Sequence, residues 1–232
     1  FLNISDWVKA MSRFRMQKQE IRRFLEAKEK TGLLKWAESD RSAVRTLTSL
    51  LFDSEPLISY RAAEAMGWVS ALEFRKRPEK VRQLLRRLFW MMNDESGNVG
   101  WRAPETIGEV LANNPPLIEE YAAVLGSYLN EEPFEKGVRI AIIRAAGVNR
   151  EAFRNLTGAL VKSLDSEDPA IRGLSIMALK ATGDAAAKNK IKSLSDDYDS
   201  FSLYDFKAGK FAVMKVSKAA ESYLKEWPER EL

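Results

Sequence analysis

The stretch NDESGNVGWRAPETIGEV, residues 93–110, decides how the chain is interpreted. Its acidic residues predict a tight turn. A helix is expected from about Trp101, because Pro104 is tolerated only in the first helical turn. Weaker copies of the same design occur on both sides, each with an acidic turn followed by a helix that carries an arginine near its start. The stretch is therefore one unit of a repeat.

The arginines give the period of this repeat. Arg61, Arg102, Arg139 and Arg172 are separated by 41, 37 and 33 residues. An apolar-striped helix precedes each acidic turn, and a second helix follows it. Helix, turn and helix at a period of roughly 30–45 residues is typical of an α-solenoid. Each helix pair in such a fold buries its apolar faces only by stacking on its neighbours.

We therefore predict an all-α fold, a right-handed α-solenoid of about five helical hairpins. An N-terminal helical cap is expected at residues 1–40 and the solenoid at residues 41–232, as one structural domain overall. Helices 151–164 and 184–194 are expected to open the last two repeats. In FSLYDFKAGKFAVMKV, residues 201–216, two apolar runs flank a glycine-containing turn, which predicts a small β-hairpin in the last repeat. The approximate repeats are 41–73, 78–113, 115–148, 151–183 and 184–227.

The composition limits the possible chemistry. The 232 residues include no Cys and no His. Disulfides, thiolate metal sites, Ser-His-Asp catalysis and histidine zinc sites are thereby excluded. We expect no catalytic residue, no metal and no cofactor, although an enzyme using carboxylates, Lys or Tyr stays open. No apolar run approaches the roughly 18 residues that span a bilayer, and the N-terminal stretch lacks a signal-peptide pattern, so we expect a cytoplasmic protein without membrane contact.

The net charge is +4, and basic residues are locally in excess in two segments. One runs from Lys9 to Arg23. Either segment can be the solvated face of a helix, or it can bind an anionic partner such as nucleic acid or an acidic protein surface. The second segment contains Lys76, Arg77, Lys80, Arg82, Arg86 and Arg87.

The repeated acids and arginines predict a structural ladder. A turn carboxylate can cap the following helix. The arginine, seven to nine residues after the first polar residue of its turn, can reach back to its own turn or to that of a neighbouring repeat. Such contacts would fix the stacking register, and ligand binding by the ladder is the alternative. The ladder residues are Asp53, Arg61, Asp94, Arg102, Glu131, Arg139, Asp165, Asp168 and Arg172.

Two neighbouring repeats also share a pattern of aromatic residue, arginine and glutamate. This composition is common in binding hot spots and suits stacking on a planar ligand. The alternative is that the aromatic residue packs between repeats and the charged pair is an internal salt bridge. The candidate binding residues are Tyr60, Arg61, Glu64, Trp101, Arg102 and Glu105.

These units resemble HEAT repeats, most closely the prokaryotic kind named after phycobiliprotein (PBS) lyases. The resemblance covers roughly residues 41–227 and is clearest in DSEDPAIRGLSIMALKATG, residues 165–183. More narrowly, RTLTSLLFDSEPLISYRAAEAMG (45–67) and WMMNDESGNVGWRAPETIGEV (90–110) resemble a group of prokaryotic HEAT-repeat proteins without an assigned reaction. HEAT proteins in general act as scaffolds and adaptors. The similarity to PBS lyases concerns repeat architecture and does not imply bilin attachment.

The sequence favours a non-enzymatic scaffold or adaptor that binds another protein. A solenoid offers an extended concave surface for this purpose. The alternative is a nucleic-acid-binding solenoid, similar to HEAT-type DNA glycosylases in architecture only, since no matching catalytic motif is present.

Overall fold

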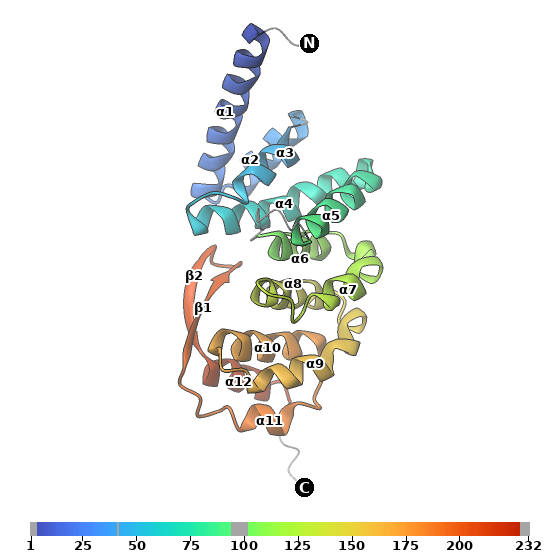
Figure 1. Cartoon of the computed structure of the whole chain (residues 1–232), viewed down its shortest axis with the longest axis vertical. Coiled ribbons are helices and arrows are strands. Elements are labelled where there is room, and N and C mark those ends of the chain that lie inside the picture. Colours follow the sequence, from blue (N-terminus) through green and yellow to red (C-terminus); the bar gives the residue numbers. More distant parts are fainter. Residues whose placement is uncertain (1–3, 41, 94–101, 228–232) are drawn as a thin grey trace. The chain divides into compact units, whose positions relative to one another are not determined.

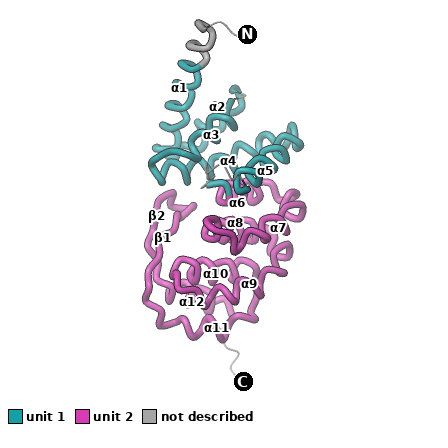
Figure 2. The backbone as a smooth tube through the Cα atoms, in the orientation of Figure 1, with its two compact units in different colours: residues 1–103 teal, residues 104–232 magenta. Residues whose placement is uncertain are grey.

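The computed structural model describes residues 4–40, 42–93 and 102–227, with side chains from residue 11 onward. The chain divides into two compact units, residues 1–103 and 104–232 (Figure 2). No helix in the described ranges is long and apolar enough to cross a membrane. Asp94 and Trp101, both predicted to matter for function or stacking, lie outside the described residues.

Unit 1 is built on one long helix, α4, which contacts the four other helices of the unit (Figure 1). Pro56 and Pro78 stand at the first positions of α4 and α5, where no intrahelical N–H bond is lost. Leu47, Met66 and Leu85 come from three different helices and are fully buried, so the apolar stripes meet in one core. The helices are α1 (Ile4–Glu26), α2 (Lys30–Ser39), α3 (Ala43–Leu50), α4 (Pro56–Lys76) and α5 (Pro78–Met92).

Unit 2 continues the alternation of helices and ends in a hairpin and a last helix. The first helices of its pairs are short and mixed with 3-10 turns, whereas the second helices are regular. The elements are α6 (Ala103–Asn113), η1 (Pro115–Leu117), α7 (Ile118–Ser127), α8 (Glu135–Ala146), η2 (Glu151–Leu156), α9 (Thr157–Lys162), η3 (Ser163–Asp165), α10 (Pro169–Thr182), α11 (Lys188–Lys192), β1 (Ser200–Asp205), β2 (Lys210–Lys215) and α12 (Val216–Leu224).

The second helices of unit 2 stack directly on one another. Helix α10 packs on both α8 and α12 (Figure 1). Helices α6 and α8 approach so closely at Gly108 that a β-carbon there would lie 2.4 Å from the Cα of Ala141. Glycine is needed at this position because any side chain would push the two helices apart.

The hairpin pairs β1 with β2 in antiparallel register, with Phe201 opposite Met214 and Tyr204 opposite Phe211. Phe201 is buried against Gly173 of α10, where a β-carbon would lie 2.2 Å from the ring. The hairpin is thus anchored on α10, the second helix of its pair. The prediction of an all-α solenoid with a small β-hairpin is confirmed.

Two helices differ from the sequence prediction. The expected helix 151–164 is split into η2, α9 and η3. The expected helix 184–194 is helical only over Lys188–Lys192. Asp184 explains the second difference, because its carboxylate accepts hydrogen bonds from the backbone N–H of Ala186 (2.8 Å) and the hydroxyl of Thr157 (2.7 Å). These bonds hold the start of the segment in a turn.

Candidate functional site

Arg61 binds the end of the N-terminal helix. Its Nη1 donates to the carbonyl oxygens of Leu25 and Glu26 near the end of α1, at 2.9 and 2.8 Å. A cation is favourable there because helix C-termini carry a partial negative charge. Asp53, the acid of the turn before Arg61, accepts a hydrogen bond from Arg22 at 2.6 Å. Burial raises the pKa of Asp53, but the hydrogen bonds from Arg22 and from the backbone N–H of Glu55, together with the charges of Arg22 and Lys18, outweigh burial, and the pKa lies below its usual range.

Arg139 is 1% exposed and joins three segments of unit 2. Its Nη1 donates to the carbonyl oxygens of Leu129 and Glu135, at 2.8 and 2.9 Å. Its Nε and Nη2 donate to the hydroxyls of Ser175 and Ser163, at 2.9 and 2.6 Å. Burial lowers the pKa of Arg139 to about 10, which leaves the side chain a cation at neutral pH. Arg139 therefore acts as a connector between repeats.

Like Arg139, Arg172 donates to carbonyl oxygens of the turn before its own helix, but its remaining nitrogens bind carboxylates. Its Nη1 donates to the carbonyl oxygens of Ser166 and Glu167, at 2.8 and 3.0 Å. Its Nε and Nη2 donate to the carboxylates of Asp197 and Asp199, at 2.8 and 2.7 Å. The hydrogen bond to Asp197 raises the pKa of Arg172. The acids of this forked contact come from the following repeat, and the turn before α10 supplies carbonyl groups.

Asp168 caps α10. Its carboxylate accepts the backbone N–H of Ala170 at 2.8 Å and forms an ion pair with Lys136 at 2.6 Å. Burial raises the pKa of Asp168, but the bonds from Lys136 and the backbone outweigh it, and the pKa lies below its usual range. Of the other turn acids, Asp165 pairs with Lys190, and Glu131 is exposed.

The predicted aromatic–arginine–glutamate residues are only partly brought together. The Arg102 guanidinium lies over the ring of Tyr60, 4.2 Å from its centre. Glu64 is 6% exposed and belongs to the interior of unit 1. Arg61 is engaged with α1 as described above, and the position of Trp101 is not described. As a binding surface, this set stays a prediction.

Glu105 lies in the interior of unit 2. It is 1% exposed and its carboxylate faces Gly137 of α8, where a β-carbon would be 3.0 Å from Oε2. A residue so placed supports the packing of α6 on α8. It does not offer an accessible carboxylate to a partner.

A hollow between α3, α4 and α5 is the most suggestive binding feature of unit 1. It encloses about 320 Å³ and is called the α3–α5 hollow below. Helices α3 and α5 both pack on α4. The lining residues are Val44, Thr48, Ser70, Glu73, Arg77, Lys80, Val81, Gln83, Leu84 and Arg87.

Cations dominate the charge of the α3–α5 hollow. Glu73 is its acid and accepts a hydrogen bond from Nη2 of Arg77 at 2.7 Å. Lys80 and Arg87 are exposed and form no ion pair with the described residues. Two positive charges are therefore left without a counter-charge in this part of the chain.

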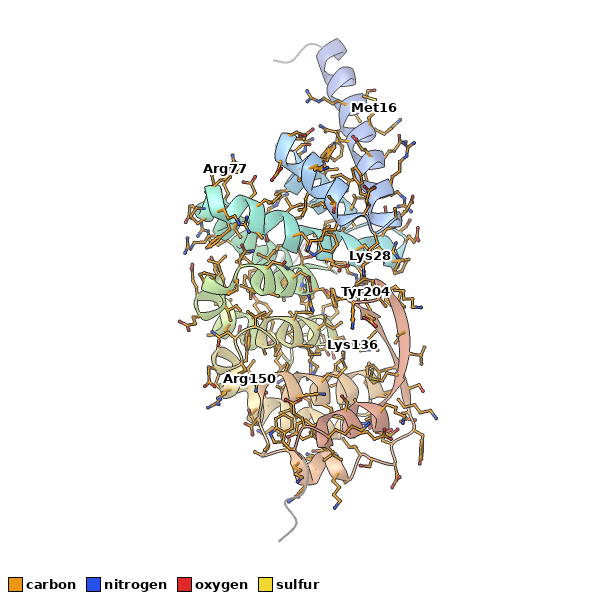
Figure 3. All side chains as sticks on the ribbon, turned by 180° about the vertical axis from the view of Figure 1, so that it is seen from behind. Met16, Lys28, Arg77, Lys136, Arg150 and Tyr204 are labelled. Atoms are coloured by element: carbon orange, nitrogen blue, oxygen red, sulfur yellow. The ribbon has the colours of Figure 1, made fainter. Side chains whose placement is uncertain are left out.

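Arg77 adds an unused donor to the wall of this hollow. The residue follows the last turn of α4 (labelled in Figure 3), and its Nε–H is buried without an acceptor among the residues that the structure describes. A buried donor left unpaired costs about 1–3 kcal/mol.

An exposed tryptophan continues the same face of α5. Lys80, Gln83, Arg87 and Trp90 follow one another at intervals of three and four residues, so they share one side of the helix. The ring of Trp90 is 63% exposed. Exposed tryptophans beside arginines are enriched at interaction hot spots.

The sequence pointed to part of this site and missed the rest. The sequence indicates the basic segment that begins at Lys76 as a local excess of positive charge. Within that segment, Arg82 and Arg86 pair with Glu79 and do not line the hollow. The contribution of α3 through Val44 was missed, because no local pattern indicates which helices flank a hollow.

A buried ion pair in unit 2 was also missed. Glu109 of α6 is fully buried and is held in a fork by Nε and Nη2 of Arg144 of α8. The same guanidinium lies 4.7 Å from the ring centre of Phe206, after β1. Thirty-five residues separate the two charged partners, so no local spacing rule could have revealed them.

The α3–α5 hollow combines charged, polar and apolar groups. Among the described residues, no group of three or more His, Cys, Asp or Glu side chains could hold a metal ion. The α3–α5 hollow offers cations, the amide of Gln83 and an apolar floor of Val81 and Leu84. These groups can recognise an anionic, partly apolar ligand.

Comparison with known proteins gives one sequence relative and several structural ones. No family model matches the chain. An uncharacterised protein of Archaeoglobus fulgidus is 33% identical over 141 residues, which cover 60% of this chain and 73% of that protein.

Two engineered proteins with crystal structures are similar over 91% of this chain. The first gives a TM-score of 0.53 at 17% identity and is covered to 90% of its length. The second gives 0.50 at 18% identity and is covered to 54%. A designed armadillo repeat protein aligns at a TM-score of 0.48 and 20% identity, over 89% of this chain and 93% of its own. At these identities the likeness concerns the fold alone.

Proposed function

The chain belongs to the same family as the uncharacterised Archaeoglobus fulgidus protein, and we propose that it is a non-enzymatic scaffold built on HEAT-type repeats. Its partner is an acidic segment of another protein, and the docking site is the α3–α5 hollow. Repeats at 41–73, 78–113, 115–148, 151–183 and 184–227, following a cap at 1–40, make up one structural domain in this proposal. The cytoplasmic location stays a prediction from the sequence.

One observation carries the proposed partner class. Arg77, Lys80 and Arg87 surround the α3–α5 hollow, and against them stands one acid, Glu73. A carboxylate between Lys80 and Arg87 would gain two attractive charges, and the guanidinium of Arg77, paired with Glu73, adds a third cation to the same wall. An acidic side chain satisfies the charges, and the backbone of an extended segment supplies further acceptors.

The apolar lining favours a peptide segment over a bare polyanion. Val81 is 1% exposed and Leu84 is 8% exposed, and both face the hollow together with Val44. An aliphatic or aromatic side chain between two acidic residues would cover this floor, and Trp90 would extend the contact along α5. The expected motif therefore alternates acidic and apolar residues.

HEAT-type repeats are supported by the equivalent arginines. Arg139 and Arg172 both donate Nη1 to carbonyl oxygens before their own helix and reach the following repeat with the other nitrogens. The likeness to the PBS-lyase type stays part of the proposal and carries no bilin chemistry with it.

Nucleic-acid binding is the alternative that the test must separate. A polyanion needs cations spread along its backbone. In α5, Arg82 and Arg86 are instead engaged by Glu79, at 3.9 and 2.5 Å. Because of this pairing, fewer cations of α5 are available to a polyanion. The arrangement favours a partner that presents few charges at defined positions.

The proposal is tested by selecting a random peptide library on the wild-type chain and counter-selecting it on the double variant Lys80→Glu/Arg87→Glu. Selected sequences are expected to place Asp or Glu beside Leu, Ile or Phe. Synthetic copies should bind the double variant about 10–100-fold more weakly, because reversing two exposed charges costs about 1–3 kcal/mol. Fluorescence anisotropy of labelled peptides measures both affinities.

The matched control is Lys76→Glu, which reverses an exposed charge in the same unit outside the lining of the hollow. It should keep nearly full affinity. The proposal fails if no sequence is enriched, or if enriched peptides bind the double variant as well as the wild type. A labelled DNA duplex that binds more tightly than any peptide, with log affinity falling linearly against log salt, would replace it by the nucleic-acid alternative.

A further inference from the structure

A second hollow lies in unit 2, between α8, α10 and α12. It encloses about 360 Å³ and is called the α8–α12 hollow below. All of its lining residues belong to unit 2, and Met214 of β2 closes part of the wall. The hairpin, which interrupts the last helical pair, therefore contributes directly to this surface.

The walls of the α8–α12 hollow are mainly apolar and adaptable. Ile143 of α8, Met177 of α10 and Met214 of β2 face it, and each is partly exposed. Methionine side chains are flexible and polarisable, so they adjust to apolar groups of different shape. Because these walls are partly exposed, the hollow is open and suits a passing chain segment better than an enclosed small molecule.

The charges of the lining leave one cation available. Lys180 donates to the carbonyl oxygen and the hydroxyl of Ser222, at 2.9 and 2.8 Å, and lies 3.6 Å from the carboxylate of Glu226. Lys180 and Glu226, the one acid of the lining, therefore neutralise each other's charge. Arg150 forms no ion pair or side-chain hydrogen bond with the described residues and is exposed (labelled in Figure 3).

The side chain of Arg150 lies against the C-terminal end of α10. A β-carbon at Gly183 would lie 2.8 Å from its Nη1 and 3.0 Å from its Cδ, so the side chain rests on the glycine that ends α10. Gly183 has φ +72°, a conformation that itself favours glycine. The cation therefore lies beside the apolar walls of the hollow.

We infer that the α8–α12 hollow is a second docking site, for a partner segment with an apolar side chain next to a carboxylate. The apolar side chain lies between Met177 and Met214, and the carboxylate binds Arg150. This site does not depend on the α3–α5 hollow. Together the two sites let one chain hold two acidic segments.

The test uses the full chain labelled with ¹³C at the methionine methyl groups, in the Lys80→Glu/Arg87→Glu background, which removes the first site. Acetyl-Leu-Phe-Glu-Glu-amide is added to millimolar concentration, and the methyl spectrum is recorded. The resonances of Met177 and Met214 are expected to shift, whereas that of Met66, fully buried in unit 1, stays in place. Acetyl-Leu-Phe-Lys-Lys-amide should give no shift at the same concentration.

Variants test the role of the cation. Arg150→Glu should lower the affinity for the acidic peptide about tenfold, because one exposed charge contact is lost and replaced by repulsion. Arg154→Glu is the matched control, because Arg154 is exposed and pairs with Glu151 at 2.7 Å outside the hollow. A far-UV circular dichroism spectrum and a urea midpoint like those of the wild type report that each variant is folded.

Two results would overturn the inference. In the first, the acidic peptide shifts neither Met177 nor Met214; if decanoate then shifts both, the hollow is assigned to a free fatty acid. In the second, Arg150→Glu binds the peptide as well as Arg154→Glu does.

Discussion

Replacing Arg139 by lysine separates the charge of this residue from its geometry. The guanidinium donates four hydrogen bonds, to Leu129, Glu135, Ser163 and Ser175. Lysine keeps the positive charge, but its donors radiate from one nitrogen and cannot reach acceptors on both sides of the guanidinium. Alanine removes the charge and all four bonds. If Arg139 fixes the register of the repeats, both variants lose stability, and alanine loses more.

The magnitude follows from the bond count. A net contribution of about 1 kcal/mol per hydrogen bond predicts a loss of about 4 kcal/mol for Arg139→Ala and about 2 kcal/mol for Arg139→Lys, which keeps roughly half of them. Removing the buried cation also removes its desolvation cost, which reduces the alanine value, whereas the cavity and the unpaired acceptors left behind increase it. For a chain of this length, about 2 kcal/mol lowers Tm by roughly 4–8 °C.

Urea unfolding followed by far-UV circular dichroism measures these differences, with thermal unfolding as a second readout. Arg154→Ala serves as the control, because Arg154 is exposed and makes one surface ion pair. That variant should change the free energy of unfolding by less than about 0.5 kcal/mol. An Arg139→Lys variant as stable as the wild type would refute the reasoning, since charge alone would then explain the residue.

Two further stability predictions follow from the packing and charges of unit 2. The pKa of Asp168 is lowered in the folded chain, so its ionised form stabilises the fold above its ordinary pKa of 3.8, and this contribution is lost as pH falls through the lower folded value. Asp168→Asn should therefore be less stable than the wild type at neutral pH. Between about pH 5 and about pH 2 it should lose less of its free energy of unfolding than the wild type does, as measured by urea midpoints. Equal losses in the two proteins would contradict a stabilising role for the ionised carboxylate of Asp168. Gly108→Ala places a β-carbon 2.4 Å from the Cα of Ala141 and should cost about 1–3 kcal/mol, whereas Gly158→Ala, with nothing within 4 Å, should cost less than about 1 kcal/mol. Equal urea midpoints for the two alanine variants would show that close α6–α8 packing does not matter.

The fold was predictable from local signals. Apolar periodicity and turn prolines such as Pro56 and Pro169 mark helices without any knowledge of the tertiary structure, and the glycine-containing turn near Gly209 marks the hairpin. The shorter helices of the last repeats were not predictable. Their limits depend on contacts such as Thr157 to Asp184, which join segments 27 residues apart.

The candidate sites depended on information that the sequence does not carry. The spacing of Arg61 and Glu64 indicates a shared helix face, but α4 is buried on most sides, so spacing cannot tell whether that face is accessible. Glu64 and Glu105 are both in the interior. The α3–α5 hollow required the placement of α3 beside α5, which follows from packing on α4 and not from the basic segment itself.

The most direct measurement is amide hydrogen exchange of the full chain with and without a peptide selected on the wild type. Binding in the α3–α5 hollow predicts slower exchange in α3 (Ala43–Leu50), in the last turns of α4 and in α5 (Pro78–Met92), and no such protection in Lys80→Glu/Arg87→Glu. Protection confined to other segments, or the same protection in the double variant, would contradict the assignment of this hollow as the docking site.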